Sequence, residues 1–180
     1  GDQGCVIEGE DGQSSVVSIG IDFSYSIIDT FTLISGFQIT NGFGIGDSGS
    51  GRRGGGIYLV GSSPKIMNTY ITQNQAHRGA GIYLVVSNPV IENTAIVNNS
   101  TTSGWGGGIH NEGGMPSLKN VNITGNSAGV GGAVEGDAIM VNCIIRDNGS
   151  PQFWDLGLIQ ATYSNIEGGH DGVGNLDVDP

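Results

Sequence analysis

The sequence predicts an all-β solenoid: a parallel β-helix in which a single chain winds into about six to seven stacked coils. Three observations support this. Glycine supplies 34 of the 180 residues, nearly three times its usual share of about 7%. The strand-favouring residues Ile (21) and Val (14) outnumber the helix-favouring Leu (7) and Ala (7). A repeat of roughly 25 residues runs through the chain, and such a unit can bury a core only by stacking on its neighbours.

Each copy of the repeat opens with a glycine-rich turn that leads into Ile or Val. The motif Gly-Gly/Ala-Gly/Ala-Ile/Val occurs at residues 54–57, 79–82, 106–109 and 131–134. A second block, Pro-x-Ile/Leu-x-Asn, follows at 64–68, 89–93 and 116–120, and the fourth copy keeps Met140-x-Asn142. The apolar runs between these glycine, proline and asparagine positions are too short for helices, so they indicate strands.

Stacking at the strand spacing of about 4.8 Å would align equivalent residues into ladders along the axis. Three inward apolar ladders are expected: Ile57/Ile82/Ile109/Val134, Ile66/Ile91/Leu118/Met140 and Ile71/Ile96/Ile123/Ile145. The column Asn68/Asn93/Asn120/Asn142 predicts a buried asparagine ladder at a turn, and Asn74/Asn99/Asn126/Asn148 is a second candidate ladder.

The flanks continue the pattern less regularly. Residues 32–41 are interpreted as an earlier coil, residues 6–9 together with 16–19 as the one before it, and residues 162–166 as the last one. We therefore expect residues 1–180 to form one β-helix domain, cut from a longer chain. Cys5 and Cys143 would lie about five coils apart, too far for a disulfide.

The columns resemble the right-handed, single-stranded parallel β-helix repeats of the pectate-lyase-like superfamily. More narrowly, they look like the repeats of bacterial polymorphic outer-membrane proteins, which carry Gly-Gly-Ala-Ile/Leu/Val and Phe-x-x-Asn. Residues 131–134 match the first motif, and residues 71–74 match the second with Ile in place of Phe. The tail, 163–169 and 174–180, resembles the end of repeat regions in large secreted bacterial proteins. The resemblance implies export, to the cell surface or the extracellular space.

Net charge and hydropathy exclude two kinds of partner, nucleic acid and the interior of a membrane. The net charge is −11 with only six Lys and Arg, which excludes the basic footprint of a nucleic-acid-binding protein. The longest apolar run, residues 82–86, is far shorter than the stretch of about 20 that crosses a bilayer, so no transmembrane segment is expected.

The sequence favours a structural or adhesive role over an enzymatic one. The Asp-Asp and Gly-His-Gly motifs of polygalacturonase-like hydrolases are absent, as is the Arg-x-Pro-x-x-Arg segment of pectate lyases. A lyase or hydrolase that acts on acidic polysaccharide stays open as the alternative, because one outward surface carries suitable side chains.

That surface comprises the columns that should point outward beside the first apolar ladder. Tyr and Trp rings can stack on sugars, Arg can pair with uronate carboxylates, and clustered carboxylates could hold calcium, the one cofactor considered. The alternative interpretation is a solvated outer sheet face. The candidate ligand-binding residues are Arg53, Tyr58, Arg78, Tyr83, Trp105, His110, Glu112, Glu135 and Asp137. Insertions at 43–53 and 100–105 leave from the same turn and could wall a shallow groove.

The coil ends suggest a second kind of partner. Unpaired strand edges invite pairing with another chain, and neither end shows an obvious cap in the sequence. We expect either that more chain continues the helix or that copies associate head to tail. Segment 167–175 could fold back, although it has few apolar residues to hold it.

Overall fold

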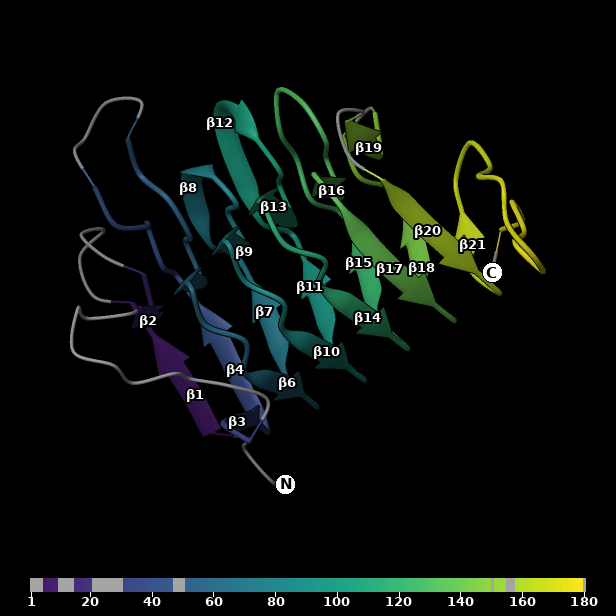
Figure 1. The fold of residues 1–180 in the computed structure, drawn as a ribbon. Coiled ribbons are helices and arrows are strands. Elements are labelled where there is room, and N and C mark those ends of the chain that lie inside the picture. The colour runs from purple at the N-terminus through teal and green to yellow at the C-terminus, as the bar shows by residue number, and fades with distance from the viewer. Residues whose placement is uncertain are drawn as a thin grey trace.

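The computed structural model describes residues 5–9, 15–20, 31–46, 51–149, 151–154 and 158–179. They form a parallel β-helix, and every pairing between the described strands is parallel (Figure 1). Strands β1 and β21 lie at opposite ends of the stack. Within the described residues, no helix is long and apolar enough to cross a membrane.

Three long sheets form the faces of the helix. Sheet A contains, in spatial order, β1 (Cys5–Glu8), β4 (Phe37–Thr40), β7 (Tyr70–Thr72), β11 (Ala95–Val97), β15 (Asn122–Thr124), β18 (Ile144–Arg146) and β21 (Asn165–Ile166). Sheet B contains β2 (Val17–Gly20), β5 (Ile57–Val60), β9 (Ile82–Val85), β13 (Ile109–Glu112), β16 (Val134–Glu135) and β19 (Phe153–Trp154). Sheet C contains β3 (Leu33–Ser35), β6 (Lys65–Met67), β10 (Val90–Glu92), β14 (Ser117–Lys119), β17 (Ala138–Val141) and β20 (Ile159–Thr162). A small sheet D pairs β8 (Gln75–Arg78) with β12 (Ser100–Trp105).

The four copies of the repeat are four regular coils, each of which passes through sheets B, C and A in turn. Four coils carry the complete repeat, fewer than the six to seven predicted. The flanks follow the same course without the complete repeat: β2–β4 pass once through sheets B, C and A before the regular coils, and β19–β21 pass once through them afterwards, with β1 in sheet A before all of these.

The three apolar ladders are confirmed. The register aligns Ile57 with Ile82, Ile91 with Leu118, and so on along each predicted column. Their side chains are buried and form the continuous core. This core gives the coils one shared hydrophobic axis.

The glycine triads are needed for steric reasons. Gly79 has φ +58°, and a Cβ there would collide with the carbonyl oxygen of Ile82. A Cβ on Gly81 would come within 2.5 Å of the carbonyl oxygen of Gly108 in the next coil. Glycine is therefore required both for the left-handed backbone and for the close approach of neighbouring coils.

The two asparagine columns have exchanged the roles assigned to them. The column of Asn68, Asn93, Asn120 and Asn142 does sit at a turn, with φ between 48° and 54°, but its side chains are exposed, so the expectation of burial was wrong. A residue with positive φ reverses the in–out alternation, so the next residue points inward instead: Thr69 and Thr94 are buried. Outside, some of these amides still bond, as Asn120 Nδ2 does to Asn93 Oδ1 at 2.9 Å.

The buried ladder is the second column, Asn74, Asn99, Asn126 and Asn148. Each Oδ1 after the first accepts hydrogen bonds from the backbone N and the Nδ2 of the asparagine one coil earlier, at 2.9–3.0 Å. Each Nδ2 also donates to an isoleucine carbonyl of the preceding coil. The ladder thus ties the coils together inside the helix.

The C-terminal segment folds back over the last coil. Tyr163 N donates to the carbonyl of Val173 and Ile166 N to that of Leu176, both at 2.8 Å. Arg146 donates to Asp177 at 2.9 Å and to Asp179 at 2.8 Å. The fold-back considered from the sequence therefore occurs, and hydrogen bonds and ion pairs hold it in place of apolar contacts.

Candidate functional site

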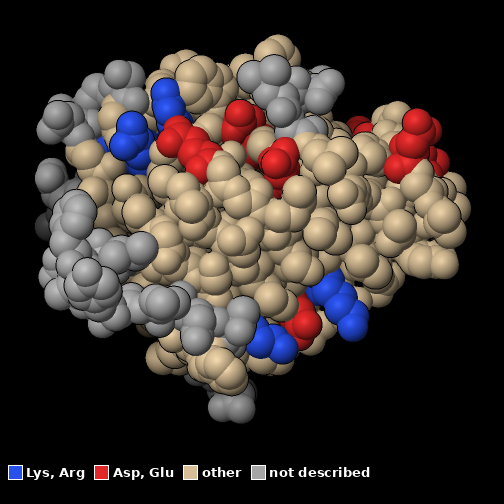
Figure 2. All heavy atoms as spheres, in the orientation of Figure 1, with Lys and Arg blue, Asp and Glu red and all other residues tan. Residues whose placement is uncertain are grey.

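The predicted site lies on the outer face of sheet B and on the turn that precedes it. Tyr58, Tyr83 and His110 stand on β5, β9 and β13, and the register places them side by side. Figure 2 shows basic and acidic side chains gathered along the edge where Figure 1 places β8, β12, β13 and β16. Most of the remaining visible surface is uncharged.

An aromatic stack runs along this face. The ring centroids of Tyr58 and Tyr83 are 5.4 Å apart with 5° between the planes, and those of Tyr83 and His110 are 5.1 Å apart with 10°. Trp105 lies against His110 with centroids 6.2 Å apart. Each coil contributes one ring to this column, and the stacking of the coils brings neighbouring rings close enough to contact one another.

The two arginines of the neighbouring column cover the stack. The Arg53 guanidinium lies 5.8 Å from the centroid of Tyr83, and that of Arg78 lies 4.2 Å from the centroid of Trp105. These cation–π contacts join the turn to the sheet face.

Two carboxylates complete the cluster. Arg78 donates to Glu112 Oε1 at 2.7 Å, and His110 Nε2 lies 3.2 Å from the same oxygen. The other ring nitrogen, His110 Nδ1, is in contact with Glu135. His110 therefore bridges two carboxylates from adjacent coils.

The cluster is more enclosed than an outward column suggests. Tyr83 is 0% exposed and His110 3%, because Trp105 and the arginines lie over them. Trp105 keeps 38% of its surface. A ligand approaching this face would meet Trp105, Arg78 and Glu112 before the stack beneath.

The enclosure shifts two pKa values. Burial, followed by the neighbouring Glu112, raises the pKa of the Tyr83 phenol far above its ordinary value. For Glu112, partial burial acts upward, but the neighbouring Tyr83 hydroxyl, His110 and Arg78 outweigh it and lower the pKa of the carboxyl. At neutral pH the site therefore holds a neutral phenol beside an ionised carboxylate.

The remaining candidate residue, Asp137, makes hydrogen bonds to neighbouring chain segments. Its Oδ1 accepts a hydrogen bond from Leu158 N at 2.5 Å, and its carbonyl accepts one from Asn111 Nδ2 at 2.9 Å. Asn111 points inward and is paired with Leu84, so the predicted register holds although a polar residue occupies a core position.

The two insertions take different forms. Residues 100–105 form β12, which pairs with β8 through a register shift between Thr101 and Trp105. That bulge is what brings Trp105 beside Arg78. In the stretch 43–53, Ile45 and Arg53 form an antiparallel bridge, while residues 47–50 lie outside the described residues.

Among the described residues, no three His, Cys, Asp or Glu side chains are grouped as metal ligands would be. In the acidic tail, Asp177 and Asp179 pair with Arg146, and Asn175 Oδ1 accepts from Ser164 N at 3.0 Å. These polar groups hold the fold-back.

Comparison with protein-family models, with curated proteins and with solved structures found no match for this chain. Sequence reasoning placed the cluster residues in adjacent columns but missed the contact of Arg78 with Glu112. The sequence does hint at this contact, because Arg78 lies at the turn just before β9 and Glu112 lies on β13, the equivalent strand of the next coil.

Proposed function

We propose that this chain is an extracellular or cell-surface β-helix with a structural and adhesive role. The observation that carries the proposal is that the aromatic and charged side chains of the sheet B face are in contact with one another across neighbouring coils. Arg78 is committed to Glu112 and Trp105, and His110 to Glu112 and Glu135. Such a network stiffens a rod across its coils.

Adhesion would use the exposed rim of the same cluster. Trp105 offers an indole surface on which a sugar ring can stack, and Arg78 can exchange its carboxylate partner for that of a uronate. The ligand class that fits is an acidic polysaccharide.

The likeness of the repeat to polymorphic outer-membrane protein repeats and to the pectate-lyase-like superfamily supports export. The abundance of acidic over basic residues is compatible with an exterior location. On the basis of this resemblance, we also propose that the chain is bacterial and secreted.

Surface exposure and glycan binding test the proposal separately. Antibodies raised against the folded chain should label intact cells of the source organism, and a glycan array should return acidic polysaccharides. Trp105→Ala should abolish that binding while the circular dichroism spectrum is retained. Labelling that requires permeabilised cells would refute the location, and binding unaffected by Trp105→Ala would refute the adhesive surface.

One observation favours a second function, cleavage of acidic polysaccharide. His110 lies between Glu112 and Glu135, and such a pair of carboxylates around an imidazole can support acid–base chemistry. Incubation with a panel of uronate polymers, followed by ultraviolet detection of unsaturated ends or by reducing-sugar assay, separates the two functions. Turnover that is lost in Glu135→Gln would replace the adhesive proposal with the enzymatic one.

A further inference from the structure

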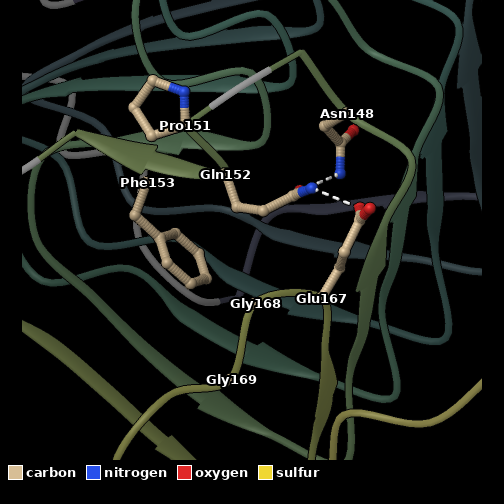
Figure 3. A pocket seen from close by; sticks show the side chains of 7 residues that line it. All are labelled: Asn148, Pro151, Gln152, Phe153, Glu167, Gly168 and Gly169. Carbon is tan, nitrogen blue, oxygen red and sulfur yellow. Dashed lines mark hydrogen bonds between the residues drawn. The ribbon is translucent and has the colours of Figure 1, made fainter.

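A pocket of about 410 Å³ opens at the C-terminal end of the buried asparagine ladder. This volume lies within the usual range for small-ligand sites. Figure 3 shows the Phe153 ring on one side and the Glu167 carboxylate on the other, with Gln152 between them. Its lining residues are Asn148, Pro151, Gln152, Phe153, Glu167, Gly168 and Gly169.

The pocket exists because the ladder stops there. Counted in the register of β18 with β21, the next ladder position falls on Gly169, which carries no side chain and closes a turn after β21 through Gly169 N to Ile166 O at 3.0 Å. A Cβ added to Gly168 or Gly169 would meet nothing within 4 Å. Asn148 Nδ2 donates instead to Gln152 Oε1 at 2.8 Å, which ends the ladder and leaves the next side-chain position open.

The carboxylate in the pocket is held in one orientation. Glu167 Oε2 accepts from Gln152 Nε2 at 2.7 Å and from Asp147 N at 2.8 Å. Both bonds use the same oxygen, which leaves Oε1 for a ligand. The nearby cation Arg146 acts on Glu167 electrostatically but gives its hydrogen bonds to Asn165, Asp177 and Asp179.

The opposite wall is aromatic. The Phe153 ring is packed edge-on against His170, with centroids 5.6 Å apart and 82° between the planes. Pro151 extends this apolar wall. A carboxylate facing an aromatic ring suits a cation with a flat, weakly hydrated surface, because such a group can stack and donate at once.

We propose that this pocket binds a guanidinium group on an aliphatic chain. One guanidinium edge donates to Glu167 Oε1, its face lies on Phe153, and its chain leaves past Gly168 and Gly169. Glu167 is the single charged residue among the lining residues, and the net charge of −11 favours a cationic ligand. This site is independent of the sheet B face and of the function proposed for it.

The test is to titrate the whole chain with three probes and to measure binding by calorimetry and by the shifts of backbone amide signals in NMR spectra. Agmatine represents a free small molecule, N-acetyl-arginine amide a peptide side chain, and N-acetyl-citrulline amide is the neutral isostere. At least one guanidinium probe should bind and shift the amides of Gln152, Gly168 and Gly169, and citrulline should not. The stronger guanidinium probe identifies the source of the group.

Two variants and one control keep the test sharp. Glu167→Gln should weaken binding about tenfold or more, in line with the loss of a charge-assisted hydrogen bond. Phe153→Leu should also weaken binding, and this variant tests the proposal separately if Glu167→Gln disturbs the fold. Glu92→Gln removes the same charge from sheet C, where Glu92 pairs with Lys65, and should leave binding unchanged.

Three outcomes would overturn the proposal. The first is no binding of either guanidinium probe up to about 10 mM, where even a millimolar site would be filled. The second is equal binding of arginine and citrulline amides. The third is an equal loss of affinity in Glu92→Gln and Glu167→Gln, which would indicate attraction to the acidic surface in general.

Discussion

Replacing Asn99 by Ala tests whether the buried amide ladder holds the coils together. Asn99 Oδ1 accepts from Asn74 N at 3.0 Å and from Asn74 Nδ2 at 2.9 Å, and its Nδ2 donates to Ile71 O and Asn126 Oδ1, both at 3.0 Å. Alanine leaves both Asn74 donors without their acceptor in a fully buried place. An unsatisfied buried group costs about 1–3 kcal/mol, so the two donors predict a loss of about 2–6 kcal/mol in the free energy of unfolding.

The matched control lies in the exposed column. Asn93 has φ 48° and accepts one exposed hydrogen bond, which water can replace. Asn93→Ala should therefore lower the free energy of unfolding by about 1–2 kcal/mol, because alanine is strained in the left-handed backbone conformation at this position. Asn93→Gly relieves that strain and should be close to wild type in stability. The assay is urea unfolding followed by circular dichroism. A loss at Asn99 no larger than that at Asn93 would show that the ladder contributes little and that the assignment of the two columns is irrelevant to stability.

Three further predictions concern titration and the fold-back. The raised pKa of Tyr83 means that its contribution to stability is complete below about pH 10 and is lost as pH rises further; absorbance titration should show a late ionisation that disappears in Tyr83→Phe. The lowered pKa of Glu112 means that its contribution is present above about pH 4.3 and is lost in acid, so the melting temperatures of wild type and Glu112→Gln should converge as pH falls below about 4. Asn175→Ala removes the acceptor of Ser164 N, and hydrogen exchange at Leu176 should then rise about tenfold, whereas exchange at Ile96 in the central coils should not change.

The apolar ladders could be predicted because their signal is carried by residue type at fixed spacing. Ile57, Ile66 and Ile71 recur in every regular coil as Ile, Leu, Val or Met, and burial is the reason for such a column. The asparagine columns could not be sorted this way, since both are invariant in residue type. Their burial depends on which residue takes positive φ at each corner, and in the second corner those residues are Gln73, Asn98, Gly125 and Asp147, which share no pattern.

The candidate site was predictable as columns but not as a packed cluster. Tyr58, Tyr83 and His110 were expected to point outward, and they do lie on the outer side of sheet B. The insertion at 100–105 marks the place of the bulge in β12, but the enclosure also depends on the side-chain conformations of Arg78 and Trp105, which the spacing of residues does not encode. The C-terminal pocket was missed for a similar reason, although a glycine at the fifth ladder position is visible in the sequence.

The ends of the helix carry the last prediction, which concerns self-association. The sequence suggests head-to-tail stacking of copies, and at the C-terminal end such stacking would need the edge of β21. In this chain that edge is already bonded: Ile166 N donates to Leu176 O, and Leu176 N donates to Ser164 O, both at 2.8 Å. Deleting residues 168–180 should free these groups as an edge that another chain can pair with, because parallel edges accept a further strand without rearrangement. Light scattering against concentration should then show association of the shortened chain beyond that of the whole chain, with retained β-sheet circular dichroism. Equal scattering of the two chains at every concentration would show that the fold-back does not protect the end, and that any stacking of copies must proceed through another surface.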